Sequence, residues 1–161
     1  MGTSKPRTLT EGATVSDDKQ AAKELVETLK DGERGFASAA EKLRDGDRSE
    51  WASTLQRLSE QRAGFHREIV AMGEDYGDDV DDSGTITAAL HRGWISLKDA
   101  VSGDDAGAVL AACSTGEDHA VSEYEKALEQ DLSHGFREVV SRQHAQVVTA
   151  RDEVKALQSA D

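Results

Sequence analysis

The fold class is decided by residues 26–72, which read VETLKDGERGFASAAEKLRDGDRSEWASTLQRLSEQRAGFHREIVAM. Apolar residues recur here at steps of three, four and seven, the spacing of one face of an α-helix. Before the turn they are Val26, Leu29, Phe36, Ala40 and Leu43, and after it Trp51, Leu55, Leu58, Phe65, Ile69 and Met72. The residues Asp45-Gly46-Asp47 break the pattern with turn-forming chemistry. The stretch therefore predicts an antiparallel helical hairpin.

The ends of these two helices are predicted from capping residues. Ser16 is a suitable N-cap, and Asp17 and Asp18 after it suit the positive end of a helix. Residues 1–15 are polar and without period, which predicts a flexible N-terminal tail. Asp47, followed three positions later by Glu50, forms a capping box that predicts the start of the second helix.

A second hairpin is predicted in the C-terminal half. A helix beginning near Asp104 or Asp105 has Leu110, Cys113, Ala120, Tyr124 and Ala127 on one face. Ser133 is the predicted cap of the last helix, whose stripe is Phe136, Val140, Val147, Ala150, Val154 and Leu157. Between the hairpins lie an acidic loop (73–84) and a shorter helix with Ile86, Leu90, Trp94, Leu97 and Val101 inward and Gly103 as its stop.

Two hairpins joined by one long crossover are the connectivity of ferritin-like bundles. We therefore expect an all-α protein: a ferritin-like antiparallel four-helix bundle over residues 16–158, with a shorter fifth helix in the crossover. Trp94 on that helix anchors the core, or seals the helix against the other helices or a second subunit.

Composition excludes several classes of partner. The 32 acidic residues outnumber the 19 Lys and Arg, for a net charge of −13, which opposes binding to nucleic acid or to an anionic membrane. No stretch is apolar and long enough to span a bilayer, and no signal peptide is evident, so a cytoplasmic location is expected. Cys113 is the only cysteine, and we expect it to be a buried, inert thiol.

Polar residues interrupt the apolar seams near the middle of each long helix. They are Glu33, Gln61 with Arg62, Glu117 and Gln143. An internal repeat aligns Gly32-Glu33 with Gly116-Glu117, so we expect these residues to form one polar layer across the bundle. A buried carboxylate needs a partner, which could be Arg62, an amide, a proton, water or a metal. His66, one turn beyond Arg62, lines the layer or faces solvent.

Several runs resemble a known family. DGERGFASAAEKL, SEQRAGF, SGTITAALHRGWISLKDAVSGDD and GEDHAVSEYEKALEQDL are similar to those of a bacterial family of ferritin-like four-helix-bundle proteins catalogued as a domain of unknown function. The similarity covers about residues 17–158. It implies a ferritin-like fold and a bacterial cytoplasmic origin, and it implies no established activity.

The ligands of a di-iron centre are incomplete. Ferritin-like metal proteins use a Glu from each of two helices and a Glu-x-x-His from each of the other two. Glu33 and Glu117 match the single glutamates, but no Glu-x-x-His occurs in the sequence. We therefore expect a structural polar layer and no cofactor. The alternative is a degenerate iron-binding protein that uses Glu33 and Glu117. His119 and Glu123, one turn apart, are weaker candidates for a divalent metal, or form a surface hydrogen bond.

These features favour a non-enzymatic, stress-related protein that acts by self-association or by binding a partner protein. Two-fold dimers are the commonest oligomers of soluble proteins, so a homodimer is expected. A bundle that binds a small molecule is a third hypothesis.

Overall fold

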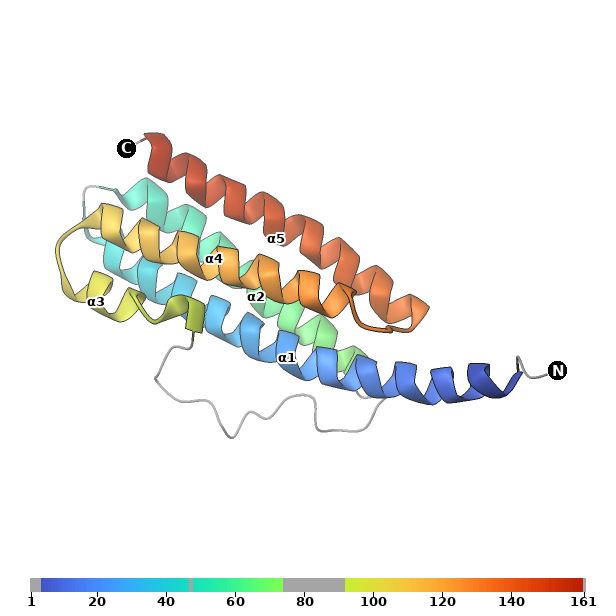
Figure 1. Cartoon of the computed structure of the whole chain (residues 1–161). Helices are drawn as coiled ribbons and strands as arrows, with labels where there is room; N and C mark the ends of the chain where they lie inside the picture. Colours follow the sequence, from blue (N-terminus) through green and yellow to red (C-terminus); the bar gives the residue numbers. More distant parts are fainter. Residues whose placement is uncertain (1–3, 47, 74–91, 161) are drawn as a thin grey trace.

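The computed structural model describes the backbone of residues 4–46, 48–73 and 92–160, and the side chains of residues 17–46, 48–72 and 93–160. Within these ranges the chain is helical and contains no strand, which confirms the predicted all-α class. The elements are α1 (Ser4–Arg44), α2 (Ser49–Gly73), the 3-10 helix η2 (Arg92–Trp94), α3 (Leu97–Ser102), α4 (Ala106–Leu128) and α5 (His134–Ala160) (Figure 1).

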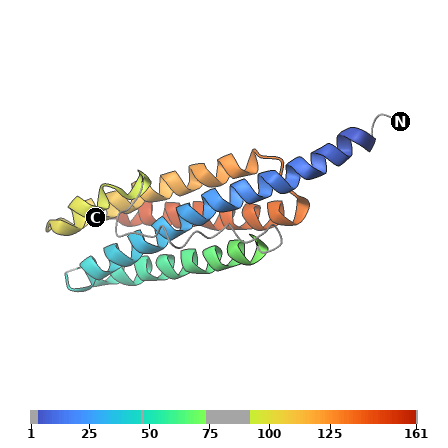
Figure 2. The ribbon, with the colours of Figure 1, turned by 90° about the horizontal axis from the view of Figure 1, so that it is seen from below.

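The four long helices lie side by side. α1 and α2 form one antiparallel pair and α4 and α5 another, while α1 also packs on α4 and α2 on α5 (Figures 1 and 2). Because α2 and α4 run in the same direction, the connection between them returns the chain along the length of the bundle. This arrangement places α2 and α4 diagonally across the centre, where their inward side chains meet.

Among the residues whose side chains are described, the core consists of two hydrophobic clusters stacked along the bundle. One includes Leu25, Val26, Leu29, Ile69, Tyr124, Phe136, Val140 and Val147. The other includes Phe36, Ala40, Leu43, Leu55, Leu58, Trp94, Leu110, Cys113 and Val154. The predicted stripe of α1 is thus buried throughout. On α2 and α4 the two clusters are separated in sequence by Arg62 and Glu117, which are 1% and 0% exposed.

The N-terminal boundary of α1 differs from the prediction. α1 begins at Ser4 and continues through Ser16, so Ser16 is not an N-cap. Pro6 is compatible with this start because the first turn of a helix has no internal acceptor for the N–H that proline lacks. The division into a tail (1–15) and a bundle domain (16–158) stays a prediction.

Asp17 and Asp18 have a different role from the predicted one. The backbone N–H of Asp131 donates to Asp17 Oδ2 at 3.2 Å. The backbone N–H and hydroxyl of Ser133 donate to Asp18 at 2.9 and 2.6 Å. These carboxylates therefore hold the α4–α5 turn against α1. Ser133 still directly precedes α5, and its carbonyl accepts from Arg137 N–H at 2.9 Å.

The predicted ends of the other helices agree with the structure only in part. Asp105 caps α4, its Oδ1 accepting from Gly107 N–H at 2.9 Å, and Gly103 follows the end of α3. The expected continuous crossover helix is interrupted in its described part, where η2 ends at Trp94 and α3 begins at Leu97. Outside the described residues lie Asp47, Ile86, Leu90 and all of the acidic loop except Gly73.

Trp94 attaches the crossover to the bundle. Its side chain is 1% exposed and packs edge-on to Phe36, with ring centroids 4.9 Å apart. A Cβ atom at Gly35 on α1 would lie 2.3 Å from the indole, and one at Gly116 on α4 would lie 2.2 Å from it. Only glycine at both positions leaves room for the ring. Trp94 therefore seals the crossover against α1 and α4, one of the predicted alternatives.

Candidate functional site

A buried ion pair crosses the centre of the bundle. Arg62 Nη1 donates to Glu117 Oε1 at 2.6 Å, and Arg62 Nη2 donates to Glu117 Oε2 at 2.8 Å. The guanidinium thus engages both carboxylate oxygens in the bidentate geometry that gives strong, directional pairing. Its Nε donates to Gln61 Oε1 at 3.1 Å, and its Cζ lies 5.2 Å from the centroid of Phe36. Every donor-bearing nitrogen of Arg62 therefore has an acceptor.

Gly32 on α1 faces this arginine. A Cβ atom at Gly32 would lie 3.4 Å from Arg62 Cγ and 3.5 Å from its Nη1. The Arg62 side chain thus passes against the backbone of α1 on its way to Glu117. Nearby, Ser59 Oγ on α2 donates to the carbonyl oxygen of Glu33 at 2.8 Å, which ties the two helices together at the same height.

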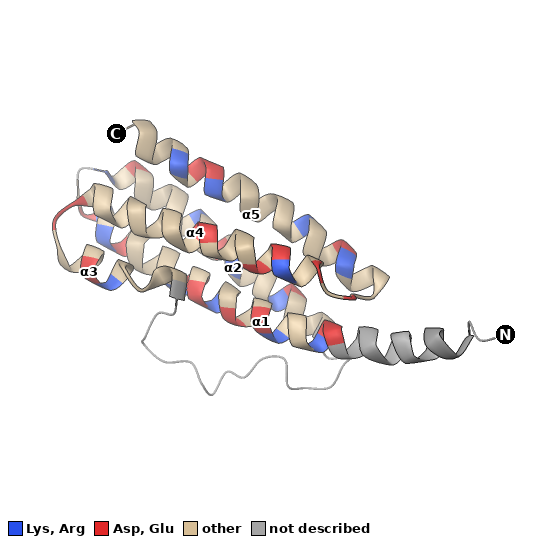
Figure 3. Cartoon of the chain, viewed as in Figure 1, with Lys and Arg blue, Asp and Glu red and all other residues tan. Residues whose placement is uncertain are grey.

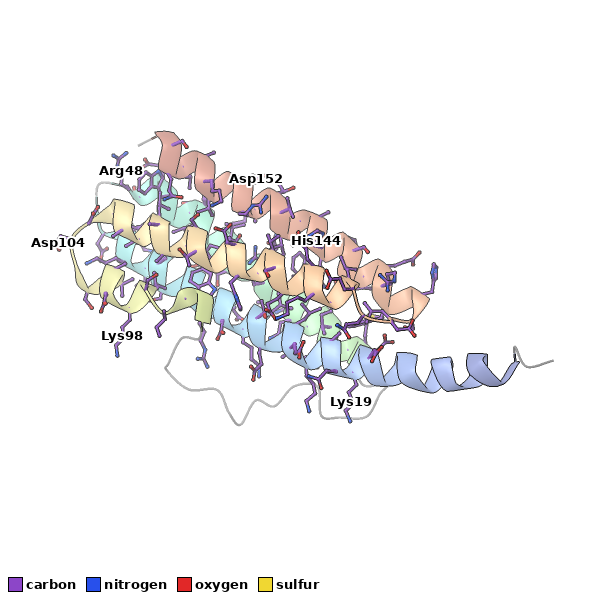
Figure 4. The ribbon with its side chains drawn as sticks, viewed as in Figure 1. Lys19, Arg48, Lys98, Asp104, His144 and Asp152 are labelled. Atoms are coloured by element: carbon purple, nitrogen blue, oxygen red, sulfur yellow. The ribbon has the colours of Figure 1, made fainter. Side chains whose placement is uncertain are left out.

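A second polar chain runs from the core to the surface between α4, α5 and α2. Tyr124 Oη donates to Gln143 Oε1 at 2.6 Å. Gln143 Nε2 donates to Glu68 Oε1 at 2.8 Å, and Arg142 forms an ion pair with the same carboxylate. His144, labelled in Figure 4, lies beside this chain, with its ring centroid 6.5 Å from that of Tyr124.

The environment shifts the ionisation of two groups in this chain. Burial raises the pKa of the Tyr124 hydroxyl, so it stays protonated as a donor. Partial burial works to raise the pKa of Glu68, but hydrogen bonds from Arg142 and Gln143 outweigh it and lower that pKa below its ordinary value. The carboxylate form of Glu68 is therefore the one that the chain stabilises.

The predicted layer is only partly assembled. Arg62 and Glu117 are in contact, and Gln61 is half-buried at the edge of the pair. Gln143 is buried but bonds to Tyr124 and Glu68. Gln143 does not join the ion pair because it lies at a different height along the bundle. On α5 the two hydrophobic clusters meet between Val147 and Ala150, at least one turn beyond Gln143.

Glu33 lies apart from the ion pair. Its side chain is 41% exposed, and its Oε1 is 3.9 Å from Nδ1 of His66, whose side chain is 18% exposed. Gly32, rather than Glu33, faces Arg62 in the interior. The one-layer prediction is therefore wrong for Glu33, because a neighbouring residue of the same helix occupies the inward position.

The residues present do not fit a di-iron centre. Both oxygens of Glu117 are bound by a guanidinium, and Glu33 is on the outer face. Glu123 accepts from Lys126 Nζ at 2.9 Å, whereas His119 packs against Gly93, where a Cβ atom would lie 2.4 Å from the His119 Cβ. Among the residues whose side chains are described, no three His, Cys, Asp or Glu converge as metal ligands would.

Cys113 is buried in the core beside this region. Burial, and then the negative charge of Glu117, raise the pKa of its thiol. The predicted burial of Cys113 is confirmed. Because the thiolate is the reactive form of cysteine, the raised pKa supports the prediction that this thiol is inert.

Sequence reasoning missed several members of these networks. Tyr124 was assigned to an apolar stripe, although a buried phenol needs a hydrogen-bond partner and so signals a nearby polar group. Glu68 and Asp18 had no such signal, because their partners lie 75 and 115 positions away in the sequence.

A family model described as a domain of unknown function (DUF2383) matches residues 19–130. The chain belongs to the DUF2383 family. The DUF2383 match contains Arg62, Glu117 and Trp94 and ends before α5, so it includes the ion pair and excludes Gln143. No curated protein matches the chain. No described helix is both long enough and apolar enough to cross a membrane.

Proposed function

We propose that this protein is a ferritin-like four-helix bundle in which a buried ion pair replaces the metal centre, and that it acts without catalysis, by self-association or by binding a partner. Two antiparallel helical pairs joined by one long crossover support the ferritin-like assignment.

The observation that carries the proposal is the complete engagement of Glu117. A metal at this carboxylate would have to displace the Arg62 guanidinium, which is 1% exposed. Arg62 would then be a buried cation without its counter-ion, which is strongly unfavourable. The residues at mid-bundle thus oppose metal binding by both occupancy and charge.

The ion pair has a structural role in this proposal. It joins α2 and α4, which belong to different hairpins and have no turn to set their relative height. Its two short, directional bonds are satisfied at only one relative position of these helices. A uniformly apolar core would tolerate sliding more easily, so the pair specifies how the two hairpins dock.

Metal analysis tests the proposal. Protein purified without a histidine tag should contain metal well below one equivalent and should not oxidise ferrous iron catalytically. Near-stoichiometric iron that is lost on Glu33→Gln with Glu117→Gln would instead establish the degenerate iron-binding alternative. A matched control is Glu24→Gln with Glu125→Gln, which removes two exposed carboxylates from the same helices.

Sedimentation equilibrium tests the mode of action. We expect a concentration-dependent homodimer. A monomer at every concentration would leave partner binding as the mode of action and rule out self-association. The bacterial cytoplasmic location and the stress-related role stay predictions.

A further inference from the structure

A groove on the outer surface between α1 and α2 has a charge opposite to that of the whole protein. It has a volume of about 290 Å³ and is lined by Lys30, Glu33, Arg34, Ala63, His66 and Arg67. We call it the α1/α2 groove. Positions 30, 33 and 34 of α1 and 63, 66 and 67 of α2 share one face of each helix because they are three and four residues apart.

The lining carries three cations and one carboxylate, so its net charge is +2 with His66 neutral. The complete chain carries −13. Acidic and basic side chains are interspersed along the helices (Figure 3), and a local excess of cations is therefore a departure from the average surface. Such an excess attracts anions that the rest of the surface repels.

The walls of the groove are fixed in advance. The hydrogen bond from buried Ser59 to the Glu33 carbonyl joins α1 to α2 directly beside it. Lys30, Arg34 and His66 also make interactions within the protein. A preorganised site binds with a smaller loss of conformational entropy than a flexible one.

The donors suit a phosphate group. Arg34 and Arg67 each present a planar guanidinium that can bond two phosphate oxygens at once, and Lys30 adds a compact positive charge. The groove's volume of about 290 Å³ leaves space for a small ligand, and Ala63 contributes only a methyl group to its lining. We propose that the α1/α2 groove binds a small phosphate-bearing anion, a site that goes beyond the non-catalytic role proposed above.

Glu33 limits the strength of binding. Its carboxylate lies 3.9 Å from His66 within the groove and repels an incoming anion. Glu33→Gln should therefore bind phosphate more tightly than the wild type, by about threefold or more, because a like charge in direct contact is removed. The iron-binding alternative makes a different prediction for the same substitution. There Glu33 is a ligand of the metal, so Glu33→Gln should weaken iron binding.

Isothermal titration with inorganic phosphate at constant ionic strength tests the site. The groove variant is Arg34→Gln with Arg67→Gln. The control is Lys23→Gln with Lys98→Gln, which removes the same charge from exposed positions outside the groove. The side chain of Lys98, for example, points away from the bundle (Figure 4). We expect the groove variant to bind at least about tenfold more weakly, the usual effect of losing one charged hydrogen bond. The control should bind within about twofold of the wild type, because exposed charges that do not line the groove are screened by salt.

Two results would overturn the inference. One is the absence of saturable binding to the wild type, and the other is an equal loss in the groove and control variants, which would show a general charge effect. If the double groove variant does not fold, Arg67→Gln alone replaces it, because Arg67 is exposed. Repeating the titration with glycerol 3-phosphate distinguishes the source: tighter binding than inorganic phosphate indicates a phosphorylated metabolite, and equal binding indicates the free ion.

Discussion

Breaking the buried ion pair from one side should destabilise the protein far more than removing it completely. Glu117→Leu leaves Arg62 as a buried cation, and Arg62→Met leaves Glu117 as a buried anion; the two side chains are 1% and 0% exposed. Removing one partner of such a pair costs about 3–5 kcal/mol. That is a large part of the ~5–15 kcal/mol that stabilises a typical domain. The double variant places two apolar side chains together and should recover most of the loss.

Urea unfolding followed by circular dichroism measures these differences. With a slope of about 2 kcal/mol per molar, a loss of about 4 kcal/mol lowers the urea midpoint by roughly 2 M. Each single variant should show a shift of this size, and the double variant should unfold close to the wild type. The double-mutant cycle then gives a large coupling energy between Arg62 and Glu117, as direct contact requires.

The reasoning fails if each single substitution costs less than about 1 kcal/mol, the value of an exposed ion pair. It also fails if the two single losses simply add in the double variant. Arg57→Met and Glu153→Leu provide the matched comparison. This pair also joins two helices, but its side chains are 56% and 36% exposed, so its cycle should show little coupling.

Three further predictions concern other contacts. Gly116→Ala places a methyl group against the indole of Trp94, and this overpacking should lower the free energy of unfolding by at least about 1–3 kcal/mol. In a Trp94→Ala background the same change should have almost no effect. Thermal unfolding measures both differences. Asp18→Asn weakens two hydrogen bonds from Ser133 and should lower the free energy of unfolding by about 1–3 kcal/mol. Amide hydrogen exchange should become faster only in the α4–α5 turn. Unchanged exchange there would contradict the proposed contact. The pKa of Glu68 is lower in the folded protein than its ordinary value of 4.5, so its stabilising effect is complete above about pH 4.5 and is lost as the pH falls through the folded pKa. Unfolding of Glu68→Gln should therefore depend less on pH in that acidic range, and an unchanged profile would show that Glu68 contributes nothing to acid sensitivity.

Prediction from sequence worked where the signal was local and periodic. The stripe from Val26 to Leu43 predicted the inward face of α1 because burial of apolar surface selects one face of a 3.6-residue repeat. The start of α4 was predicted near Asp104 or Asp105, and Asp105 is its cap; such a prediction succeeds because a cap and the amide it binds are neighbours in the chain. The start of α1 was wrong, since a good capping residue at Ser16 does not prevent a helix from continuing through it.

The polar positions show where periodicity stops being sufficient. Spacing located an interruption in the α1 seam to within one residue, but Gly32 and Glu33 are adjacent and only one of them can face Arg62. Gln143 interrupts the α5 seam as predicted, yet it lies at a different height from Arg62, because the height of each helix depends on how the hairpins dock.

The sequence by itself therefore determined that this chain is helical, where its hairpins turn and which faces are apolar, because each of these depends on residues close together in the chain. Tertiary structure alone decided that Arg62 binds Glu117, that Trp94 fits between Gly35 and Gly116, and that Asp18 holds the turn before α5. These contacts join residues from different helices. Their partners are chosen by the height and rotation of whole helices in the packed bundle, which no local pattern encodes.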